Sequence, residues 1–292
     1  MTKFTVVGGN ASQDLAKKVA KRLKATYIRT ELRTFPDGEN KITFSSKPKK
    51  SKIVVVQSVY PPVDSNLIQC LSIISKAKQF SSNVIAVIPY MGYARQDKEF
   101  LPGEVITMQV IAKLFKAIGA TKIVVVDIHS QTGLKYFKIS AKNVSAVSEL
   151  VKYFKKLKLR KPLVVSPDSG GKNRAKEFAK LLKSDYIALK KQRDRKTGKV
   201  KMISLNHRKV IEKDLILVDD MITTGDSIIR ATEFLKKQKC GKVFVTCTHA
   251  LLVNGAEKKM KKAGVSKIVS TNSVPGSTSV VDISNIVANA IM

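Results

Sequence analysis

The chain has 292 residues, 43% of them hydrophobic, which is enough for two globular domains of ordinary size with substantial cores. No apolar run reaches the roughly 18 residues of a membrane span, and the N-terminus lacks a signal-peptide layout, so we expect a cytoplasmic protein with no membrane partner. The cysteines include no CxxC pair, so we expect neither a disulfide framework nor a zinc site. Lys and Arg outnumber Asp and Glu by 54 to 22, but these charges are dispersed without an aromatic-interleaved motif, so we expect no specific nucleic-acid partner.

Short β-rich runs alternate with helical patterns along the whole chain. The runs are FTVVGG (4–9), KIVVVQS (52–58), VIAVIPY (84–90), KIVVVDIHS (122–130), PLVVSPDSGG (162–171), DLILVDDM (214–221), KVFVTCTHALL (242–252) and KIVSTNS (267–273). This alternation predicts an α/β fold of mostly parallel sheets flanked by crossover helices. A basic helical segment that ends at Pro162 predicts a crossover from an N-terminal domain, residues 1–145, to a C-terminal domain, residues 146–292.

The first polar motif is FPDGENKI at residues 35–42. Pro-Asp-Gly alone is typical of an ordinary turn between strands. Phe35, however, has a ring that could stack on a base, and Asp37 and Glu39 are carboxylates on either side of Gly38. The motif is therefore either a structural turn or part of a nucleotide site.

A second polar stretch follows the strand expected at VIAVIPY. Arg95, Gln96, Asp97 and Lys98 offer planar and charged groups that suit triphosphate oxygens and an adenine edge. A solvated loop after a strand is the alternative, because polar residues are normal there.

Metal-capable side chains follow two other strands. Asp127 and His129 end the run KIVVVDIHS, and Asp168 precedes a Gly pair in SPDSGG. Mg²⁺ prefers oxygen ligands and retains waters, so an imidazole beside a carboxylate would be an unusual magnesium site. A structural histidine and a helix N-cap at Asp168 are the alternatives.

The stretch LKKQRDRKTGKVK, residues 189–201, is densely cationic around a Thr-Gly turn. Such a run is usually a solvated hairpin. The alternative is a closing lid that brings Lys191 and Arg193 onto developing phosphoryl charge.

The most specific string is LILVDDMITTGDSI, residues 215–228. The continuously apolar run Leu215 to Val218 predicts a strand buried on both faces, with Asp219 and Asp220 at its C-terminal end and a helix from Ile228. The loop of small and hydroxylated residues before the helix is typical of an anion site, and its members are Thr223, Thr224, Gly225, Asp226 and Ser227. Carboxylates beside a phosphate cradle suit vicinal hydroxyls or a cation, so a sugar phosphate meets both demands; a polar turn is the alternative.

The two halves of the chain have a common order of elements. Residues 52–71 repeat the strand, loop and helix order of residues 214–235, but Pro61 and Pro62 occupy the loop and the paired acids are absent. We infer an internal duplication with one degenerate phosphate loop, which unrelated strand orders would contradict.

Together the motifs resemble the ribose-phosphate pyrophosphokinases, or PRPP synthetases, over nearly the whole chain. The motifs, in family order, are FPDGE, PYMGYARQDK, VDIHS, SPDSGG, KKQR, VDDMITTGDSI, THALLVNGA and TNSVP. The resemblance implies two phosphoribosyltransferase-like α/β domains, the first without a working PRPP loop. It also implies synthesis of PRPP from ribose 5-phosphate and Mg-ATP, with release of AMP.

The resemblance also implies the roles of individual residues. Phe35, Asp37, Gly38, Glu39, Arg95 and Gln96 would bind ATP; His129 and Asp168, with Asp127 as a further candidate, would serve Mg²⁺; Lys191 and Arg193 would form the catalytic lid; Arg193, Asp219, Asp220, Thr223, Thr224, Gly225, Asp226 and Ser227 would bind ribose 5-phosphate. Because the FPDGE loop in this family reaches a neighbouring subunit's ATP, a homo-oligomer, at least a dimer, is implied.

Three positions depart from the family pattern. Asp226 stands where many members have Gly, which suits a phosphate only if its carboxylate points away, and Lys138 and Lys142 replace frequent aspartates. The two lysines give no support to an extra cation site there. The chain is also compact, like the short archaeal members of the family, so regulation by phosphate or ADP is not carried over. Two other functions remain open: a phosphoribosyltransferase, which would explain residues 215–228 alone, and a non-catalytic relative of the synthetases that binds partners.

Overall fold

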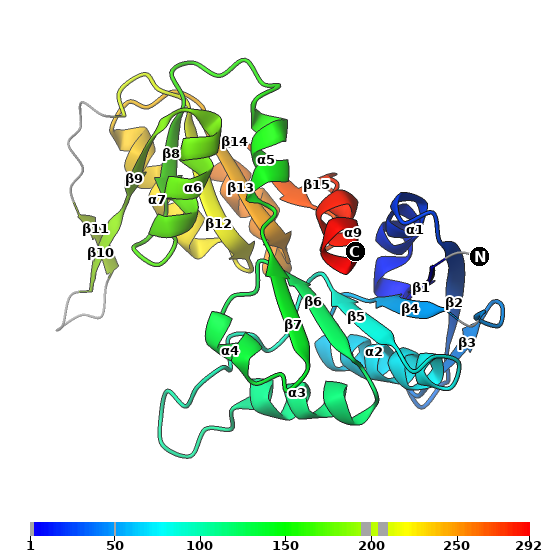
Figure 1. Ribbon diagram of the computed structural model, residues 1–292. Helices are drawn as coiled ribbons and strands as arrows, with labels where there is room; N and C mark the ends of the chain where they lie inside the picture. Colours follow the sequence, from blue (N-terminus) through cyan, green and yellow to red (C-terminus); the bar gives the residue numbers. More distant parts are fainter. Residues whose placement is uncertain (1–2, 50, 194–199, 204–209) are drawn as a thin grey trace. The chain divides into compact units, whose positions relative to one another are not determined.

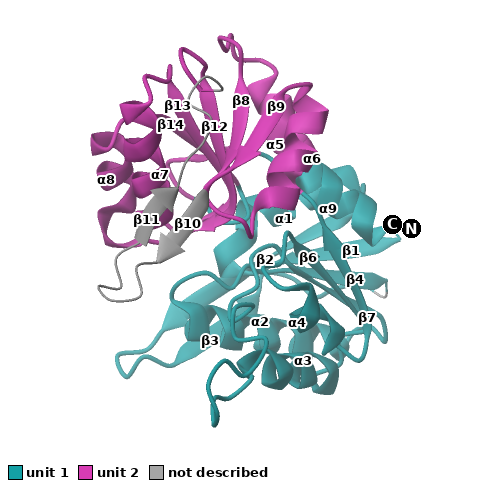
Figure 2. Ribbon diagram, turned by 90° about the vertical axis from the view of Figure 1, so that its left-hand side faces the viewer, with its two compact units in different colours: residues 1–145, 272–275, 282–292 teal, residues 146–271, 276–281 magenta. Residues whose placement is uncertain are grey.

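The computed structural model describes residues 3–49, 51–193, 200–203 and 210–292, with the backbone alone for 190–193 and 200–203. Contacts divide the chain into two units (Figure 2). Unit 1 contains residues 1–145, 272–275 and 282–292, and unit 2 contains residues 146–271 and 276–281. The chain passes from unit 1 to unit 2 after Ser145 and returns to unit 1 at its C-terminal end, which a single division of the sequence does not describe.

Unit 1 is built on a seven-stranded sheet (Figure 1). Its strands are β1 (Phe4–Gly8), β2 (Thr26–Thr34), β3 (Asn40–Phe44), β4 (Lys52–Val56), β5 (Val84–Ile88), β6 (Lys122–Val126) and β7 (Ser140–Val144). Their order is β3-β2-β1-β4-β5-β6-β7, and β3 alone pairs antiparallel with its neighbour. All other pairs are parallel, so the carboxyl ends of six strands meet at one edge.

Helices cover both faces of this sheet. They are α1 (Gln13–Arg22), α2 (Val63–Lys78), α3 (Thr107–Ala117), α4 (Gln131–Lys135) and α9 (Ser284–Ile291), with a 3₁₀ turn η1 (Asn10–Ser12). The core between the sheet and helices α2 and α3 includes Val55, Ile74 and Phe115. On the opposite face of the sheet, helices α1 and α9 contact each other; α1 also contacts β1, and α9 also contacts β6 (Figure 1).

Unit 2 has a six-stranded, entirely parallel sheet. Its strands are β8 (Leu163–Ser166), β9 (Asp185–Ala188), β12 (Leu215–Ile222), β13 (Val243–Ala250), β14 (Val265–Thr271) and β15 (Ser279–Val281), in the order β15-β14-β13-β12-β8-β9. Between β9 and β12 the chain forms a separate antiparallel pair, β10 (Lys190–Arg193) and β11 (Val200–Ile203). The expected α/β fold with two mostly parallel sheets is confirmed.

The sheet of unit 2 is buried on both faces. Its helices are α5 (Val147–Phe154), α6 (Lys172–Leu182), α7 (Asp226–Lys237) and α8 (Ala256–Lys262), with a 3₁₀ turn η3 (Val253–Gly255). Along β12, Leu215 and Leu217 pack into the core with α7 and α8, whereas Ile216 and Val218 pack into the core with α5 and α6. This alternation explains why a continuously apolar run was needed. No helix in the described ranges has the length and apolar composition for crossing a bilayer.

The parallel strands of the two units have the same order. We treat β3 and the β10–β11 pair as insertions after the second strand of their units. The remaining strands then have the order β2-β1-β4-β5-β6-β7 in unit 1 and β9-β8-β12-β13-β14-β15 in unit 2. If the strands of each unit are numbered along the chain, both orders are 2-1-3-4-5-6. Strands β4 and β12 are equivalent in this scheme, as the comparison of residues 52–71 and 214–235 requires. Unrelated strand orders would contradict an internal duplication, and the two orders are the same.

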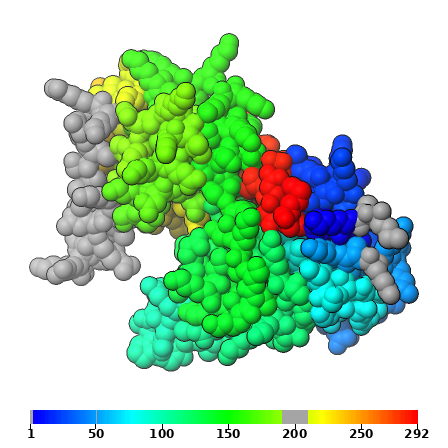
Figure 3. All heavy atoms as spheres, viewed as in Figure 1, coloured from blue at the N-terminus to red at the C-terminus, as the bar shows by residue number. Residues whose placement is uncertain are grey.

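The C-terminal segment is held in unit 1 by polar contacts. Arg22 of α1 donates a 2.6 Å hydrogen bond from Nε to Ser284 Oγ of α9. Ser58, after β4, donates a 2.5 Å hydrogen bond to the carbonyl of Ser273. In Figure 3 the red C-terminal segment lies against the blue N-terminal segment, in agreement with these contacts.

Candidate active site

Two carboxylates, Asp219 and Asp220, lie in the last part of β12. The sequence predicts that this strand ends at Val218, but it continues to Ile222 because β13 pairs with it as far as Ala250. Both acids are partly buried, and each accepts a hydrogen bond from the backbone N–H of the next residue, at 2.9 Å and 2.8 Å respectively. The carboxylates are thus fixed at the carboxyl end of the sheet.

Negative charge accumulates at this edge. The pKa of Asp219 is raised to about 8, first by burial and then by the neighbouring carboxylate of Asp220, with Asp168 contributing as well. The pKa of the Cys247 thiol is raised by burial and by the same aspartate pair, while Arg174 lowers it. A cation or several hydroxyl donors would relieve this charge.

The loop after β12 leads directly into the N-terminus of helix α7. It contains the five residues expected from the sequence: Thr223, Thr224, Gly225, Asp226 and Ser227. Gly225 has a φ of 77°, in the left-handed region that favours glycine, and α7 follows it directly. The helix therefore begins at Asp226, two residues before the predicted start at Ile228, so Ser227 lies in its first turn.

Asp226 has a local partner. Its Oδ2 accepts a 3.0 Å hydrogen bond from the Thr224 hydroxyl, and its side chain is exposed. A carboxylate in the first turn also interacts favourably with the positive end of the helix dipole. These two contacts give a structural reason for an acid at position 226. The Thr224 hydroxyl, however, donates its hydrogen bond to Asp226 and not to a ligand.

Asp168 follows β8, which pairs with β12 in parallel. Its Oδ1 accepts hydrogen bonds from the backbone N–H groups of Gly170, at 3.0 Å, and Gly171, at 3.2 Å, just before α6 begins. The buried Ser166 hydroxyl donates to the Asp168 carbonyl at 2.6 Å. Asp168 therefore orders the turn that leads into α6, but it is not the N-cap: that position is Gly171, which offers no side-chain cap, so the capping alternative is wrong in detail. Ser166 supports this turn, and no sequence motif singled it out.

The FPDGE motif forms the loop between the antiparallel strands β2 and β3. The Phe35 N–H donates to the Glu39 carbonyl at 2.8 Å, Gly38 has a φ of 91°, and Asp37 Oδ1 accepts from the Glu39 N–H at 3.1 Å. The Phe35 ring lies 5.2 Å from the Arg33 guanidinium carbon. The turn is thus well ordered, while Asp37 and Glu39 remain exposed.

Two more loops of unit 1 carry predicted residues at the ends of adjacent strands. Arg95 and Gln96 lie in an exposed turn after β5, where the Gln96 N–H donates to the Tyr93 carbonyl at 2.8 Å. After β6, Asp127 is buried with a φ of 40°, and His129 is exposed. Because β5 and β6 pair in parallel, both loops open at the same edge of this sheet.

The loop of unit 1 that is equivalent to the phosphate loop is occupied by the chain itself. The Ser58 hydroxyl donates to the Ser273 carbonyl and accepts a 3.0 Å hydrogen bond from the Tyr90 N–H. Helix α2 follows Pro62, which has no N–H, and the Asn66 amide donates to the Tyr60 carbonyl at 2.8 Å. These contacts are a physical reason to expect no phosphate site here.

The predicted residues fall into two groups. Asp168, Asp219, Asp220 and the loop 223–227 share one edge in unit 2, and the FPDGE loop, the Arg95–Gln96 turn and the His129 loop belong to unit 1. The side chains of Lys191 and Arg193 lie outside the described residues. Within the described ranges, no group of three or more His, Cys, Asp and Glu side chains forms a ready-made metal cage.

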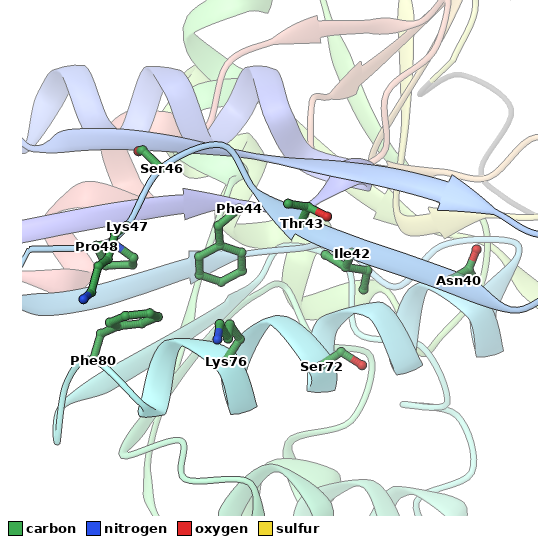
Figure 4. Close-up of a pocket in the computed structure, with 10 residues that line it drawn as sticks. All are labelled: Asn40, Ile42, Thr43, Phe44, Ser46, Lys47, Pro48, Ser72, Lys76 and Phe80. Atoms are coloured by element: carbon green, nitrogen blue, oxygen red, sulfur yellow. The ribbon is translucent and has the colours of Figure 1, made fainter.

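A cavity of about 460 Å³ lies elsewhere in unit 1, between β3 and α2 (Figure 4). Ile42 and Phe44 point from β3 toward Lys76 of α2 and the Phe80 ring, and the Lys47 side chain lies at the same end. None of the ten residues that line it belongs to the predicted ATP, metal or sugar sites. The cavity is therefore separate from the candidate active site.

Comparisons with known proteins agree with the motifs and with the fold. A sequence profile described as the N-terminal domain of ribose phosphate pyrophosphokinase matches residues 4–119, and one described as a phosphoribosyl synthetase-associated domain matches residues 208–292. The ribose-phosphate pyrophosphokinase of Sulfurisphaera tokodaii is 34% identical over 98% of this chain and 99% of its own. The chain belongs to the ribose-phosphate pyrophosphokinase family. The family member of Methanobrevibacter smithii is also 34% identical, over 98% of this chain and 99% of its own.

A solved structure supports membership of the pyrophosphokinase family. The phosphoribosylpyrophosphate synthetase of Mycobacterium smegmatis is 28% identical, superposes with a TM-score of 0.86, and the match covers 99% of this chain and 97% of that one. The α/β fold of the chain is accordingly that of a ribose-phosphate pyrophosphokinase.

Proposed function

We propose that this protein transfers the β,γ-diphosphoryl group of Mg-ATP to the anomeric hydroxyl of ribose 5-phosphate. A bond forms between that oxygen and the β-phosphorus, while the bond between the β-phosphorus and the α,β-bridging oxygen breaks. The hydroxyl proton is released to solvent, AMP leaves with the bridging oxygen, and PRPP is the other product. The observation that carries the proposal is the edge of unit 2, where the Asp219–Asp220 pair lies next to a hydroxylated loop at a helix N-terminus.

Unit 2 would bind the sugar phosphate. Asp219 and Asp220 would accept hydrogen bonds from the two ribose hydroxyls, which donate protons into a region of excess negative charge. The loop 223–227 would wrap the 5-phosphate with backbone N–H groups and hydroxyls. Asp226 would keep its carboxylate on the Thr224 side and away from the phosphate.

Unit 1 would bind ATP. Phe35 would stack on the adenine, with Asp37, Gly38 and Glu39 forming the loop beside it. Arg95 and Gln96, exposed after β5, would contact the nucleotide with planar donors. As in the family pattern, the FPDGE loop would serve the ATP of a neighbouring subunit, so we expect a homo-oligomer, at least a dimer, in the cytoplasm.

Mg²⁺ is the expected cofactor, and the side chains present suit it. Burial first, and then the neighbouring carboxylate of Asp220, raise the pKa of Asp219, so a bound cation would favour its ionised form. Carboxylate oxygens are the ligands that Mg²⁺ prefers. Asp168 and His129 would serve the metal, with Asp127 as a further candidate. When bound, Mg²⁺ would neutralise phosphate charge and orient the diphosphoryl group.

Lys191 and Arg193 would close over the reacting phosphates as a lid. Both belong to β10, in the antiparallel pair inserted between β9 and β12. Since phosphoryl transfer depends on positioning and charge stabilisation, cations supplied on closure would act mainly on the rate. Arg193 would also contact ribose 5-phosphate.

One assay tests the function and separates it from the alternatives. Purified protein is incubated with ribose 5-phosphate, Mg²⁺ and ATP, and AMP and PRPP are measured; both should form in equal amounts and only with the sugar present. A phosphoribosyltransferase would instead consume PRPP and a base without releasing AMP from ATP. A non-catalytic partner protein would do neither.

A further inference from the structure

A buried carboxylate connects two of the loops at the edge of unit 1. Asp97 directly follows Arg95 and Gln96, and it is 9% exposed although its neighbours in the turn are exposed. Its Oδ2 accepts a hydrogen bond from the Ser130 hydroxyl, and Ser130 directly follows His129. One hydrogen bond therefore joins the turn after β5 to the loop after β6.

Further contacts hold this connection in place. The Tyr136 hydroxyl donates to the Asp97 carbonyl at 2.7 Å, and Ser130 Oγ accepts from the Gly133 N–H at 3.4 Å as the N-cap of α4. On the other side of the turn, the Met108 N–H at the start of α3 donates to the Gln96 carbonyl at 3.2 Å. The turn is thus fixed between the first residues of two helices.

The chemistry of the contact suits a positioning role. A hydrogen bond from a hydroxyl to a carboxylate is stronger than one between neutral groups, and a carboxylate that is mostly removed from water depends on it. Arg95, Gln96 and His129 are exposed, so their direction toward a ligand depends on the backbone beneath them. Asp97 and Ser130 set that backbone in both loops at once.

We propose that Asp97 and Ser130 are positioning residues that fix the Arg95–Gln96 turn relative to His129, and thereby align the triphosphate of ATP with its metal ion. The inference rests on the proposed function, in which Arg95 and Gln96 bind ATP and His129 serves Mg²⁺. It concerns the nucleotide half of the reaction alone. Loss of the hydrogen bond between Asp97 and Ser130 should therefore weaken the binding of ATP and Mg²⁺ but not that of ribose 5-phosphate.

Ser130→Ala is the first test. We expect the KM for ATP and the Mg²⁺ concentration for half-maximal activity to rise about tenfold, with the KM for ribose 5-phosphate changed less than twofold. Ser130→Thr, which retains the hydroxyl, should restore the KM for ATP to within about threefold of the wild type. Ser140→Ala, on the exposed face of β7, is the matched control and should leave all three constants unchanged.

Asp97→Asn and the double variant Asp97→Asn/Ser130→Ala complete the test. If the two residues act through one contact, the double variant should be no worse than the poorer single variant. Circular dichroism and thermal unfolding of each variant verify folding, and Tyr136→Phe replaces Asp97→Asn if the latter does not fold.

Each outcome decides between the two proposals. A wild type without sugar-dependent AMP release would overturn the proposed function and this inference with it. An active wild type whose Ser130→Ala variant keeps its KM for ATP, or loses ATP and sugar use equally, would overturn the inference alone. Equilibrium binding of ATP to the same proteins, measured by calorimetry, should weaken in parallel with the rise in KM.

Discussion

Asp219 of β12 lies directly opposite Cys247 of β13 in the parallel register. Cys247 is fully buried, so Asp219 faces a weakly polar neighbour on that side and the carboxylate of Asp220 next to it along the strand. Neither neighbour supplies a cation. This environment explains why burial is the largest cause of the raised pKa of Asp219.

The pKa of Asp219 predicts how Asp219→Asn changes the free energy of unfolding. The folded pKa of about 8 lies above the ordinary 3.8, so the stability that this group contributes is complete below pH 4 and is lost as the pH rises through 8. Asp219→Asn removes that loss. We expect it to raise the free energy of unfolding at pH 9 by on the order of a few kcal/mol over the wild type, and far less at pH 4.

Urea unfolding in EDTA at pH 4, 6 and 9 measures this effect. Equal stabilisation by Asp219→Asn at pH 4 and pH 9 would mean that the carboxylate is not penalised in the folded state.

The same substitution should impair use of the sugar. An amide offers one acceptor oxygen where the carboxylate has two, so Asp219→Asn should raise the KM for ribose 5-phosphate about tenfold or more while ATP binding changes little. Steady-state kinetics with each substrate varied in turn measure the difference. Lost ATP affinity with an unchanged sugar dependence would contradict the assignment.

The sequence predicted the parts of the fold in which side-chain pattern alone decides the structure. All eight apolar runs are strands, because burial on both faces requires a continuous apolar run. In unit 1, strands β3 (NKITF) and β7 (SAKNV) were not predicted, since edge strands carry polar residues. Strand β2 (TYIRTELRT) was not predicted either, because only part of it is buried and it has no continuous apolar run. The extension of β12 through Asp219 and Asp220 was also missed, because backbone pairing with β13 does not depend on those side chains.

The candidate site was predictable for a similar reason. Charged and hydroxylated residues after buried strands identify the edge where ligands bind in open α/β sheets. The supports of that edge were not predictable from pattern. Asp97 and Ser130 are 33 residues apart, and the return of α9 to unit 1 depends on contacts with α1, so both required the tertiary structure.

Gly171→Ala should disturb the Asp168 turn for a steric reason. Gly171 has a φ of −82°, which alanine adopts without strain, but a Cβ there would lie 2.6 Å from Ser166 Oγ. We expect a loss of about 1–3 kcal/mol in the free energy of unfolding. Adding Ser166→Ala removes the clashing oxygen and should recover at least half of that loss, although the hydrogen bond to the Asp168 carbonyl is lost. Denaturant unfolding measures both; no recovery in the double variant would place the strain elsewhere.

The basic composition predicts salt-sensitive binding to nucleic acid. With a formal charge of +32 from dispersed lysines and arginines, the protein should be retained on DNA at low salt and released near physiological ionic strength. Filter binding with two unrelated DNA sequences across a salt series is the measurement. Retention at high salt, or a preference for one sequence, would indicate specific recognition.

Lys191 provides the sharpest test of the proposed mechanism. As AMP departs, charge shifts onto the α,β-bridging oxygen, and a lysine on a closing loop can meet that charge only when the lid is closed. Lys191→Ala should therefore lower kcat by roughly 10² or more, while ATP binding changes much less.

Lys190→Ala is the matched control for that prediction. In the antiparallel pair, Lys190 is opposite Ile203 and Lys191 is opposite Met202, so the two lysines occupy different positions in the register. The two lysines should therefore not be equivalent, and Lys190→Ala should cost little. Single-turnover AMP release for both variants separates the chemical step from binding. Similar behaviour of the two variants, or a Lys191→Ala kcat within about threefold of the wild type, would mean that the stretch is a charged hairpin and not a catalytic lid.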